Sequence, residues 1–377
     1  MTLILFFLFH IIYKGDNMKI DKTLLISTII LISFGILMVY SSSNVWALYK
    51  YNDAFKFVKS QFIFFLVGLF LIKILINIDP TIYEKYANKI LFVCFILLVL
   101  VLIPGIGKVR NGSRSWFGLG PLGIQPSEFT KIGLLIYTSK YLAHNNKNIK
   151  DIKKGLLPLF LVIIIFFLLI MLEPDFGTAM VIILTLVGLI FIAGPKLSFF
   201  IKIGLVGLLG IVVLIAIAPY RLERIVSYLN PWSDPLGSGF QIIQSLYAIG
   251  PSSLLGAGFG NSIQKNFYLP EPQTDFIFSI IAEEFGFLGV FLTISLFAII
   301  FYRSVKISLN ENDLFKKYLA FGLSFGITLQ VILNVLVVTG TIPTTGITCV
   351  FLSYGGSSLL VSMISIGLIL SISKHQN

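Results

Sequence analysis

The sequence predicts an all-α polytopic membrane protein with about ten transmembrane helices, and two observations support this class. The 377-residue chain is 56% hydrophobic and only 12% charged, whereas a soluble globular domain carries about 25% charged residues. Its mean hydropathy of +0.95 indicates a chain that lies largely in lipid. A spanning helix needs roughly 20 mostly apolar residues, so this length accommodates about ten spans and their loops.

Apolar runs mark the expected spans, and residues 18–377 are expected to form a single transmembrane domain. The first 17 residues hold an apolar run too short to span the bilayer, without the basic start and cleavage site of a signal peptide. We expect them to be a cytoplasmic lead or to precede a true start at Met18. The spans are expected at residues 23–43, 58–77, 88–103, 127–143, 155–172, 176–193, 198–219, 276–302, 315–339 and 350–373, the fourth being the least apolar.

Lys and Arg residues indicate the side of the membrane on which each loop lies. With the segment before the first span in the cytoplasm, the inner loops carry more Lys and Arg than the outer ones, as the positive-inside rule requires. Both termini are then cytoplasmic, and the loops at about 104–126 and 220–275 lie outside. The loop at 220–275 is long and rich in Pro, Gly, Ser and Asn, a composition and length typical of functional loops.

The same composition argues against other classes of protein. The net charge of +11 comes from basic residues scattered between apolar runs, so we expect membrane anchoring and no nucleic-acid partner. Cys94 and Cys349 lie in or beside apolar runs, and neither has a second ligand at metal-binding spacing. The three histidines lie outside the long loops, which argues against a histidine-based zinc site or catalytic triad.

Charged residues inside predicted spans are candidates for function, because charge is costly in lipid. Glu128 and Lys131 lie one helical turn apart and could pair, either as a structural tie between helices or as part of a site. Glu283 and Glu284 point about 100° apart on a helix, so we expect that they can hardly face one partner. Interior hydrogen bonds or a hydrated cavity must hold at least one of them.

Two acidic motifs lie at expected outer ends of spans, and each has two readings. In Glu173-Pro174-Asp175 the carboxylates could cap the next helix or bind a cation. Asp275 follows a stretch with two prolines, which we expect to be extended. It could be a helix N-cap, or a carboxylate held at the height of a lipid headgroup and usable as a general base.

Outer basic residues and small residues complete the candidates. Glycines beside hydroxyl side chains in 339–346 and 353–358 would allow either close approach to a ligand or tight helix packing. The basic residues could contact phosphate groups of a substrate or of ordinary lipid headgroups; they are Arg110, Arg114, Arg221, Arg224 and Lys265.

With these motifs in place, the chain resembles the SEDS family of RodA, FtsW and SpoVE from Met18 to the C-terminus, and its long loop is most similar to the FtsW/SpoVE branch. Some FtsW proteins carry Lys at the position of Thr345, so any role of that Lys does not transfer. The matching stretches are Arg114-Ser115-Trp116, Gln125-Pro126-Ser127-Glu128 with Lys131, Glu173 to Thr178, Asn230 to Gln241, Leu269 to Phe278 and Ser353 to Ser358.

The resemblance implies a peptidoglycan glycosyltransferase that polymerises lipid II at the outer face of the bacterial cytoplasmic membrane, in division or sporulation. It implies a class B penicillin-binding protein and other division or elongation proteins as partners, Mg²⁺ or Mn²⁺ as a candidate metal, and no organic cofactor. The essential aspartate of the family corresponds to Asp275, which we expect to be catalytic. Residues expected to bind substrate are Arg114, Trp116, Glu128, Lys131, Arg221, Arg224, Lys265, Glu271, Ser353 and Ser357.

Two other functions remain open at this point. A lipid II flippase would use intramembrane charges such as Glu128 and Glu283 to line a path and would make no polymer. A non-catalytic scaffold for the transpeptidase would tolerate neutral outer carboxylates.

Overall fold

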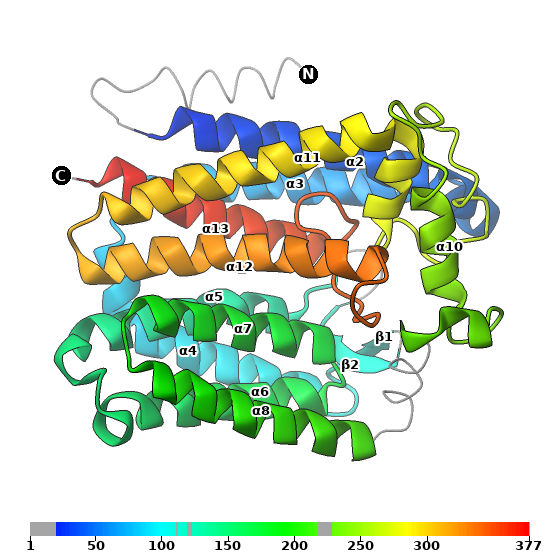
Figure 1. Cartoon of the computed structure of the whole chain (residues 1–377). Coiled ribbons are helices and arrows are strands. Elements are labelled where there is room, and N and C mark those ends of the chain that lie inside the picture. The colour runs from blue at the N-terminus through cyan, green and yellow to red at the C-terminus, as the bar shows by residue number, and fades with distance from the viewer. Residues whose placement is uncertain (1–19, 111, 119–122, 218–227, 377) are drawn as a thin grey trace.

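The computed structural model describes residues 20–110, 112–118, 123–217 and 228–376. The expectations for the first 17 residues and for Arg221 and Arg224 lie outside the described residues. In the described part, ten long helices follow the ten predicted apolar runs (Figure 1). They are α2 (Lys22–Tyr51), α3 (Lys56–Leu75), α4 (Thr81–Leu102), α5 (Pro126–His144), α6 (Leu157–Leu172), α7 (Phe176–Ile192), α8 (Leu197–Ile217), α11 (Ile277–Leu309), α12 (Leu314–Val338) and α13 (Gly356–Lys374).

The helices have the length and composition of a multi-pass membrane protein. Within the described residues, seven of them are long and apolar enough to cross a bilayer. Helix α5, predicted to be the least apolar span, is not among these seven, because it carries charged side chains along its length. Pro126 stands at its first turn, the position where proline costs no backbone hydrogen bond.

Two elements were not foreseen, and both lie in the predicted outer loops. Strands β1 (Lys108–Arg110) and β2 (Ser113–Trp116) form an antiparallel hairpin, and α10 (Phe240–Ile249) is a short helix within the long loop. Both lie at the end of the bundle opposite the C-terminus (Figure 1). We call this end, which carries residues 108–116 and 240–249, the loop end.

Some helix boundaries differ from the predicted spans. Helix α13 begins at Gly356, six residues after the expected start at 350, because residues 350–354 form a turn. Helices α2 and α11 extend beyond the predicted ends at 43 and 302. Apolar run length locates the part of a helix in lipid, whereas polar residues can continue the same helix beyond it.

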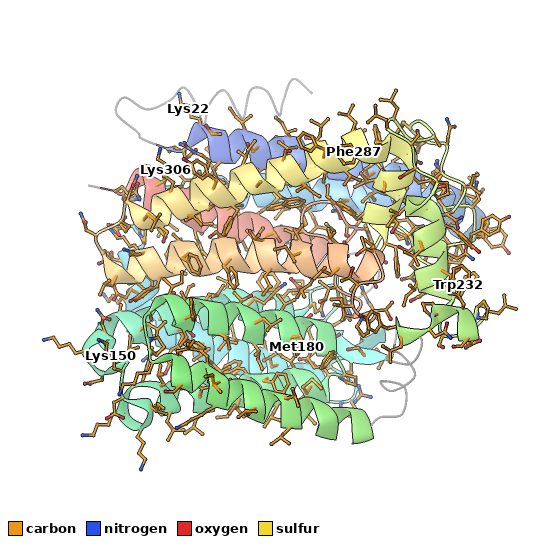
Figure 2. The ribbon with its side chains drawn as sticks, viewed as in Figure 1. Lys22, Lys150, Met180, Trp232, Phe287 and Lys306 are labelled. Carbon is orange, nitrogen blue, oxygen red and sulfur yellow. The ribbon has the colours of Figure 1, made fainter. Side chains whose placement is uncertain are left out.

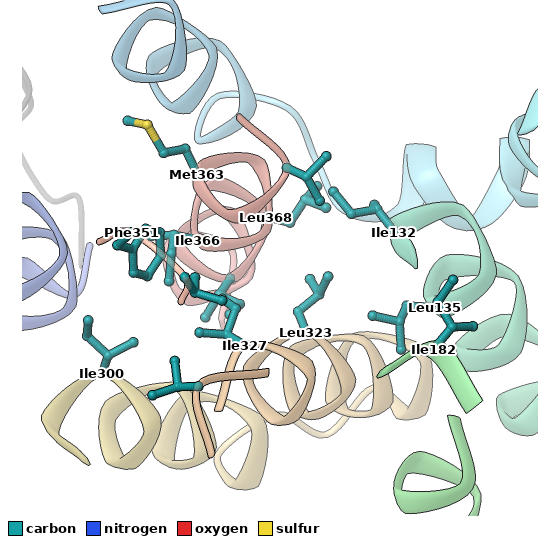
Figure 3. Packing of buried hydrophobic residues seen from close by; sticks show 14 of the residues in the cluster. Ile132, Leu135, Ile182, Ile300, Leu323, Ile327, Phe351, Met363, Ile366 and Leu368 are labelled. Carbon is teal, nitrogen blue, oxygen red and sulfur yellow. The ribbon is translucent and has the colours of Figure 1, made fainter. Parts of the chain in front are cut away.

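Helix α12 is central, since it packs against α5, α7, α11 and α13. Figure 3 shows Leu323 and Ile327 of α12 between side chains of α5, such as Ile132, and of α13, such as Leu368. All four are buried. This packing places the loop ends of α11, α12 and α13 together, which is where the polar candidates gather.

Candidate active site

Asp275 lies directly before α11 at the loop end. The N-cap position of α11 belongs to Phe276, so the interpretation of Asp275 as the N-cap is wrong. The side chain of Asp275 is half-buried. Its Oδ2 lies 3.7 Å from the point that a β-carbon on Gly346 would occupy, and Gly346 has a φ of +73°. Asp275 therefore faces the glycine-containing loop between α12 and α13.

One buried amide holds both sides of this contact. Asn334 of α12 donates from Nδ2 to the carbonyl oxygens of Asp275 and Ile347, each at 2.7 Å. Sequence reasoning missed Asn334. A buried amide within an apolar helix is nevertheless a recognisable signal, because such side chains form hydrogen bonds between elements in membranes.

Ser353 fixes the next part of the same loop rather than facing a ligand. Its side chain is buried. Its hydroxyl donates to the carbonyl oxygen of Thr274 at 2.6 Å and accepts from the Cys349 amide at 2.8 Å. The Tyr354 amide donates to the carbonyl of Gln273 at 2.8 Å. These bonds tie the chain on both sides of residue 353 to the segment that ends at Asp275, so Ser353 positions the site.

Ser357 also stabilises the backbone, here in the segment between the hairpin and α5. Its buried hydroxyl accepts from the Gln125 amide at 3.0 Å and donates to the carbonyl of Gly123 at 3.3 Å. The side chain of Gln125 donates to Asp175 Oδ2 at 2.8 Å. The starts of α5, α7 and α13 are thereby joined around the loop that contacts Asp275.

The hairpin contributes positive charge to this end of the bundle. The guanidinium of Arg110 lies over the Trp116 ring, 4.6 Å from its centroid. Burial raises the pKa of Tyr354, while the positive charge of Arg110 lowers it in part. Arg114 donates to the carbonyl of Leu102 at 3.4 Å. Arg114 and Trp116 are the two hairpin residues that were predicted to bind substrate. The Trp116 ring packs against the Arg110 guanidinium, and Arg114 anchors the hairpin to α4.

Two buried polar atoms beside Asp275 are without hydrogen-bond partners in the described part of the chain. They are Gln273 Oε1 and Thr345 Oγ1. Buried polar atoms are nearly always bonded, so both atoms are candidates for contact with a ligand or a water molecule next to Asp275.

Glu128 and Lys131 form the predicted pair, with 2.7 Å between Oε2 and Nζ. The same ammonium donates to Gln330 Oε1 on α12 at 2.9 Å, and Gln330 Nε2 donates to the carbonyl of Thr348 at 3.1 Å. Both charged side chains are largely buried. The pair ties α5 to α12 and to the site loop, which is the structural alternative named above.

Of the two roles considered for this motif, the structure assigns the helix cap to Asp175, and it buries Glu173. Asp175 caps α7 by accepting from the Thr178 amide at 3.1 Å. Glu173 is fully buried, and neither of its carboxylate oxygens has a hydrogen-bond partner among the described residues. Burial, with the adjacent charge of Asp175, raises the pKa of Glu173 to about 9. Glu173 is therefore neutral at physiological pH.

Helix α11 is broken near the site, and the preceding loop completes it. Gly286 has a φ of +62°, and a β-carbon there would overlap the carbonyl oxygen of Ser253. Two loop amides donate to helix carbonyls and two helix amides donate to loop carbonyls, which satisfies groups that the break frees. The bonds run from Ala257 to Glu283, Gly258 to Glu284, Phe287 to Ser253 and Leu288 to Leu254, at 2.9–3.1 Å.

The two adjacent glutamates hold this loop together, so the expectation that they can hardly face one partner is wrong. Glu283 accepts from the Ser262 hydroxyl and from the Ile263 amide. Glu284 accepts from the Ser262 amide at 3.3 Å. The loop wraps around the helix, so carboxylates that diverge by about 100° still reach the same turn.

Lys265 lies inside this assembly and not at the surface. Its side chain is 3% exposed, and its Nζ lies 3.0 Å from Glu284 Oε1 and 3.1 Å from the hydroxyl of Ser41 on α2. The ammonium is thus occupied by internal partners, and we no longer count Lys265 among the residues that could bind a phosphate group.

The stretch before Asp275 is folded into successive turns, so the expected extended chain is wrong. Glu271 has a φ of +43° and accepts at its carbonyl from the Thr274 amide at 3.0 Å. Its side chain is exposed. Pro270 and Pro272 therefore shape a compact turn in front of Asp275, and Glu271 stands on its outer surface.

The donor set for the expected Mg²⁺ or Mn²⁺ is weak. Across residues 20–110, 112–118, 123–217 and 228–376, no cluster of three or more His, Cys, Asp or Glu side chains has the geometry of a metal site. Divalent cations of this type prefer several oxygen ligands. We therefore assign no step of the chemistry to a metal.

The fold and site define a multi-pass membrane protein with a half-buried carboxylate, Asp275, held next to a glycine-containing loop at the loop end. A family model for FtsW, RodA and SpoVE, described as "Cell cycle protein", matches residues 22–377. The chain belongs to this family.

Curated relatives and solved structures are similar to this chain over nearly its whole length. Stage V sporulation protein E of Bacillus subtilis is 49% identical over 355 residues, covering 94% of this chain and 97% of the relative. A probable peptidoglycan glycosyltransferase FtsW of Trichlorobacter lovleyi is 42% identical, covering 94% and 93%. A structure of a peptidoglycan synthase complex matches with a TM-score of 0.78 at 29% identity, covering 95% and 99%. Thermus thermophilus RodA matches with a TM-score of 0.72 at 25% identity, covering 96% and 100%.

Breaking the buried Lys265–Glu284 pair should destabilise the protein strongly. Lys265→Met leaves a buried carboxylate without its cation, so we expect unfolding in detergent to become easier by about 3–5 kcal/mol. The double variant Lys265→Met/Glu284→Gln should recover part of this loss. Lys59→Met is the control, because its pair with Asp53 is exposed to solvent and should contribute little to stability. Equal losses in the two single variants would contradict the buried pair.

Glu173 should make stability depend on pH. Since its folded pKa is raised, folding takes up a proton, and the stabilisation present below the ordinary pKa of 4.5 is lost as pH rises toward about 9. Glu173→Gln is neutral at every pH, so its melting temperature should exceed that of the wild type by a margin that grows between pH 5 and 9. Melting curves in detergent measure this, with exposed Glu271→Gln as control. A constant margin would show that Glu173 is ionised in the fold.

Proposed function

We propose that the chain is a peptidoglycan glycosyltransferase that polymerises lipid II at the outer face of the cytoplasmic membrane. The observation that carries the proposal is the position of Asp275, a half-buried carboxylate fixed through its backbone by Asn334 and set against Gly346. Relatives named as probable peptidoglycan glycosyltransferases, about two-fifths identical over nearly the whole chain, support it.

The reaction joins a growing strand to the next lipid-linked unit. The 4-hydroxyl oxygen of lipid II attacks the anomeric carbon of the strand, whose bond to undecaprenyl pyrophosphate breaks as the new glycosidic bond forms. An α-linked donor and a β-linked product require inversion in one displacement, which needs a general base but no carboxylate nucleophile.

Asp275 takes the proton of the attacking hydroxyl, a contribution typically worth about 10²–10⁴-fold in rate. The leaving pyrophosphate carries away the electron pair and needs positive charge nearby. Arg110, stacked on Trp116 beside Tyr354, supplies such charge from the hairpin. Arg114 shares that hairpin, whereas Arg221 and Arg224 lie in the other expected outer loop, residues 220–275.

The alternative of a flippase is not favoured, because the intramembrane charges have internal partners. Glu128 and Lys131 bind each other and Gln330. Glu283 and Glu284 bind the loop that completes α11. None of these four side chains is thereby left to line a path through the described helices.

A transpeptidase partner, a class B penicillin-binding protein, belongs to the proposal. The solved structure that matches with a TM-score of 0.78 is of a peptidoglycan synthase complex, and its subject is the coordination of polymerization and crosslinking. A stage V sporulation protein and a probable peptidoglycan glycosyltransferase are both relatives of the chain, and both support this shared chemistry.

Replacing Asp275 should abolish polymerisation without unfolding the protein. Asp275→Asn keeps the shape of the side chain and removes the base, so strand synthesis from purified lipid II, in complex with the transpeptidase, should fall by at least about 10²-fold. Asp53→Asn, the same change at an exposed carboxylate, is the control. Wild-type rates in Asp275→Asn would remove Asp275 from the chemistry. Lipid II transport that continues without polymer in the wild type would favour a flippase.

The orientation is a second part of the proposal. Lys22, Lys150 and Lys306 lie at the end of the bundle that carries the C-terminus, whereas Trp232 lies at the loop end (Figure 2). The positive-inside rule then puts the C-terminus in the cytoplasm and Asp275 outside.

Labelling with an impermeant maleimide on protoplasts measures this orientation, because the native cysteines are buried. Leu236→Cys, at a residue 89% exposed near α10, should react on intact protoplasts. Lys150→Cys should react only after permeabilisation. The reverse pattern would place Asp275 in the cytosol, where no strand could be built.

A further inference from the structure

A cavity opens at the loop end, and Asp275 is not among the residues that line it. Its volume is about 430 Å³, within the usual range for small-ligand sites. Tyr247 and Pro251 line it from α10 and the residues that follow, and Gln264 and Glu283 line it from the loop and α11. Six residues of helix, about 9 Å of rise, separate Glu283 from the start of α11 beside Asp275.

The lining favours a neutral ligand rich in hydroxyl and amide groups. Among the described residues that line the cavity, none is Lys or Arg, which argues against a phosphate or pyrophosphate ligand. Its one charged residue, Glu283, is already bonded to Ser262 and Ile263. Gln264 Oε1 is buried and has no hydrogen-bond partner in the described part of the chain. An amide oxygen of this kind accepts from a hydroxyl or an amide N–H.

Aromatic side chains flank the polar lining. Tyr247 is 48% exposed, and its ring centroid lies 5.8 Å from that of Trp232, which is 53% exposed. Such rings offer an apolar face together with a polar handle. A sugar ring presents a matching apolar C–H face and polar edges, so Tyr247 can contact the face while Gln264 accepts from a hydroxyl or N-acetyl group.

We propose that this cavity is a saccharide-binding site that does not include Asp275, with Tyr247 and Gln264 as its binding residues. The identity of the ligand rests on the proposed function: it is an N-acetylated sugar unit of the growing glycan strand. A strand held here stays with the enzyme while successive units are joined at Asp275. The cavity then governs strand length and not the rate of each addition.

Binding of a soluble sugar tests the site without any catalysis. The probe is a β-1,4-linked N-acetylglucosamine tetramer, and the measurement is saturation-transfer NMR on the full chain in detergent. The wild type should bind it, and Tyr247→Ala and Gln264→Ala should each weaken binding by about tenfold, the loss of one good contact. Tyr247→Phe should retain most of the binding. Tyr49→Ala is the matched control, since Tyr49 is 78% exposed and lies on α2 outside the cavity lining.

Strand length provides the second readout, in the complex with the transpeptidase and lipid II. Tyr247→Ala should give shorter strands than the wild type, whereas Tyr49→Ala should give strands of wild-type length. No tetramer binding by the wild type, or equal binding by all variants, would overturn the saccharide site. A wild type that binds the tetramer but makes no polymer would instead overturn the proposed function and leave the sugar site standing.

Discussion

A helix that breaks within a membrane protein must find new partners for the backbone groups that the break frees. Helix α11 meets this requirement with the loop that precedes it in the chain, residues 253–265. Backbone bonds replace those lost at Gly286, and the carboxylates of Glu283 and Glu284 hold the far part of the loop. Because Asp275 stands at the start of the first half of α11, the loop sets the position of the proposed base.

The same constraint explains why the surroundings of Asp275 consist largely of amide and hydroxyl groups. These groups come from α12 and from the loop that follows it. The chain from 346 to 355 is irregular and lies against helices, so its carbonyl groups need donors. Gln330 and Asn334, one turn apart on α12, supply them. Ser353 then ties the loop to the residue before Asp275. These polar side chains act on the geometry of the carboxylate, and the glycine at 346 leaves room beside it.

Charged residues show how position in the sequence and role in the structure can differ. Lys265 stands in a long outer loop with Pro, Gly and Asn around it, a context typical of a solvent-facing cation. Its partners are Glu284, 19 residues later, and Ser41, 224 residues earlier. Glu173 stands at a polar turn, yet it is fully buried and neutral. In both cases the charged group is surrounded by segments that are distant in the sequence, so the pattern of neighbouring residues does not predict its environment.

The sequence by itself determined the ten helices and, through its motifs, the family, and it offered the Glu128–Lys131 pair and the cap at Asp175 among its alternatives. Each of these depends on residues within a few turns of one another, so periodicity, spacing and hydropathy suffice. Only the tertiary structure decided the partners of the α11 break, the burial of Lys265, the hold of Asn334 on Asp275 and the cavity beneath α10. These features depend on contacts between distant segments. An unpaired backbone group or charge away from water costs free energy, so such groups bond to whichever segment packs against them.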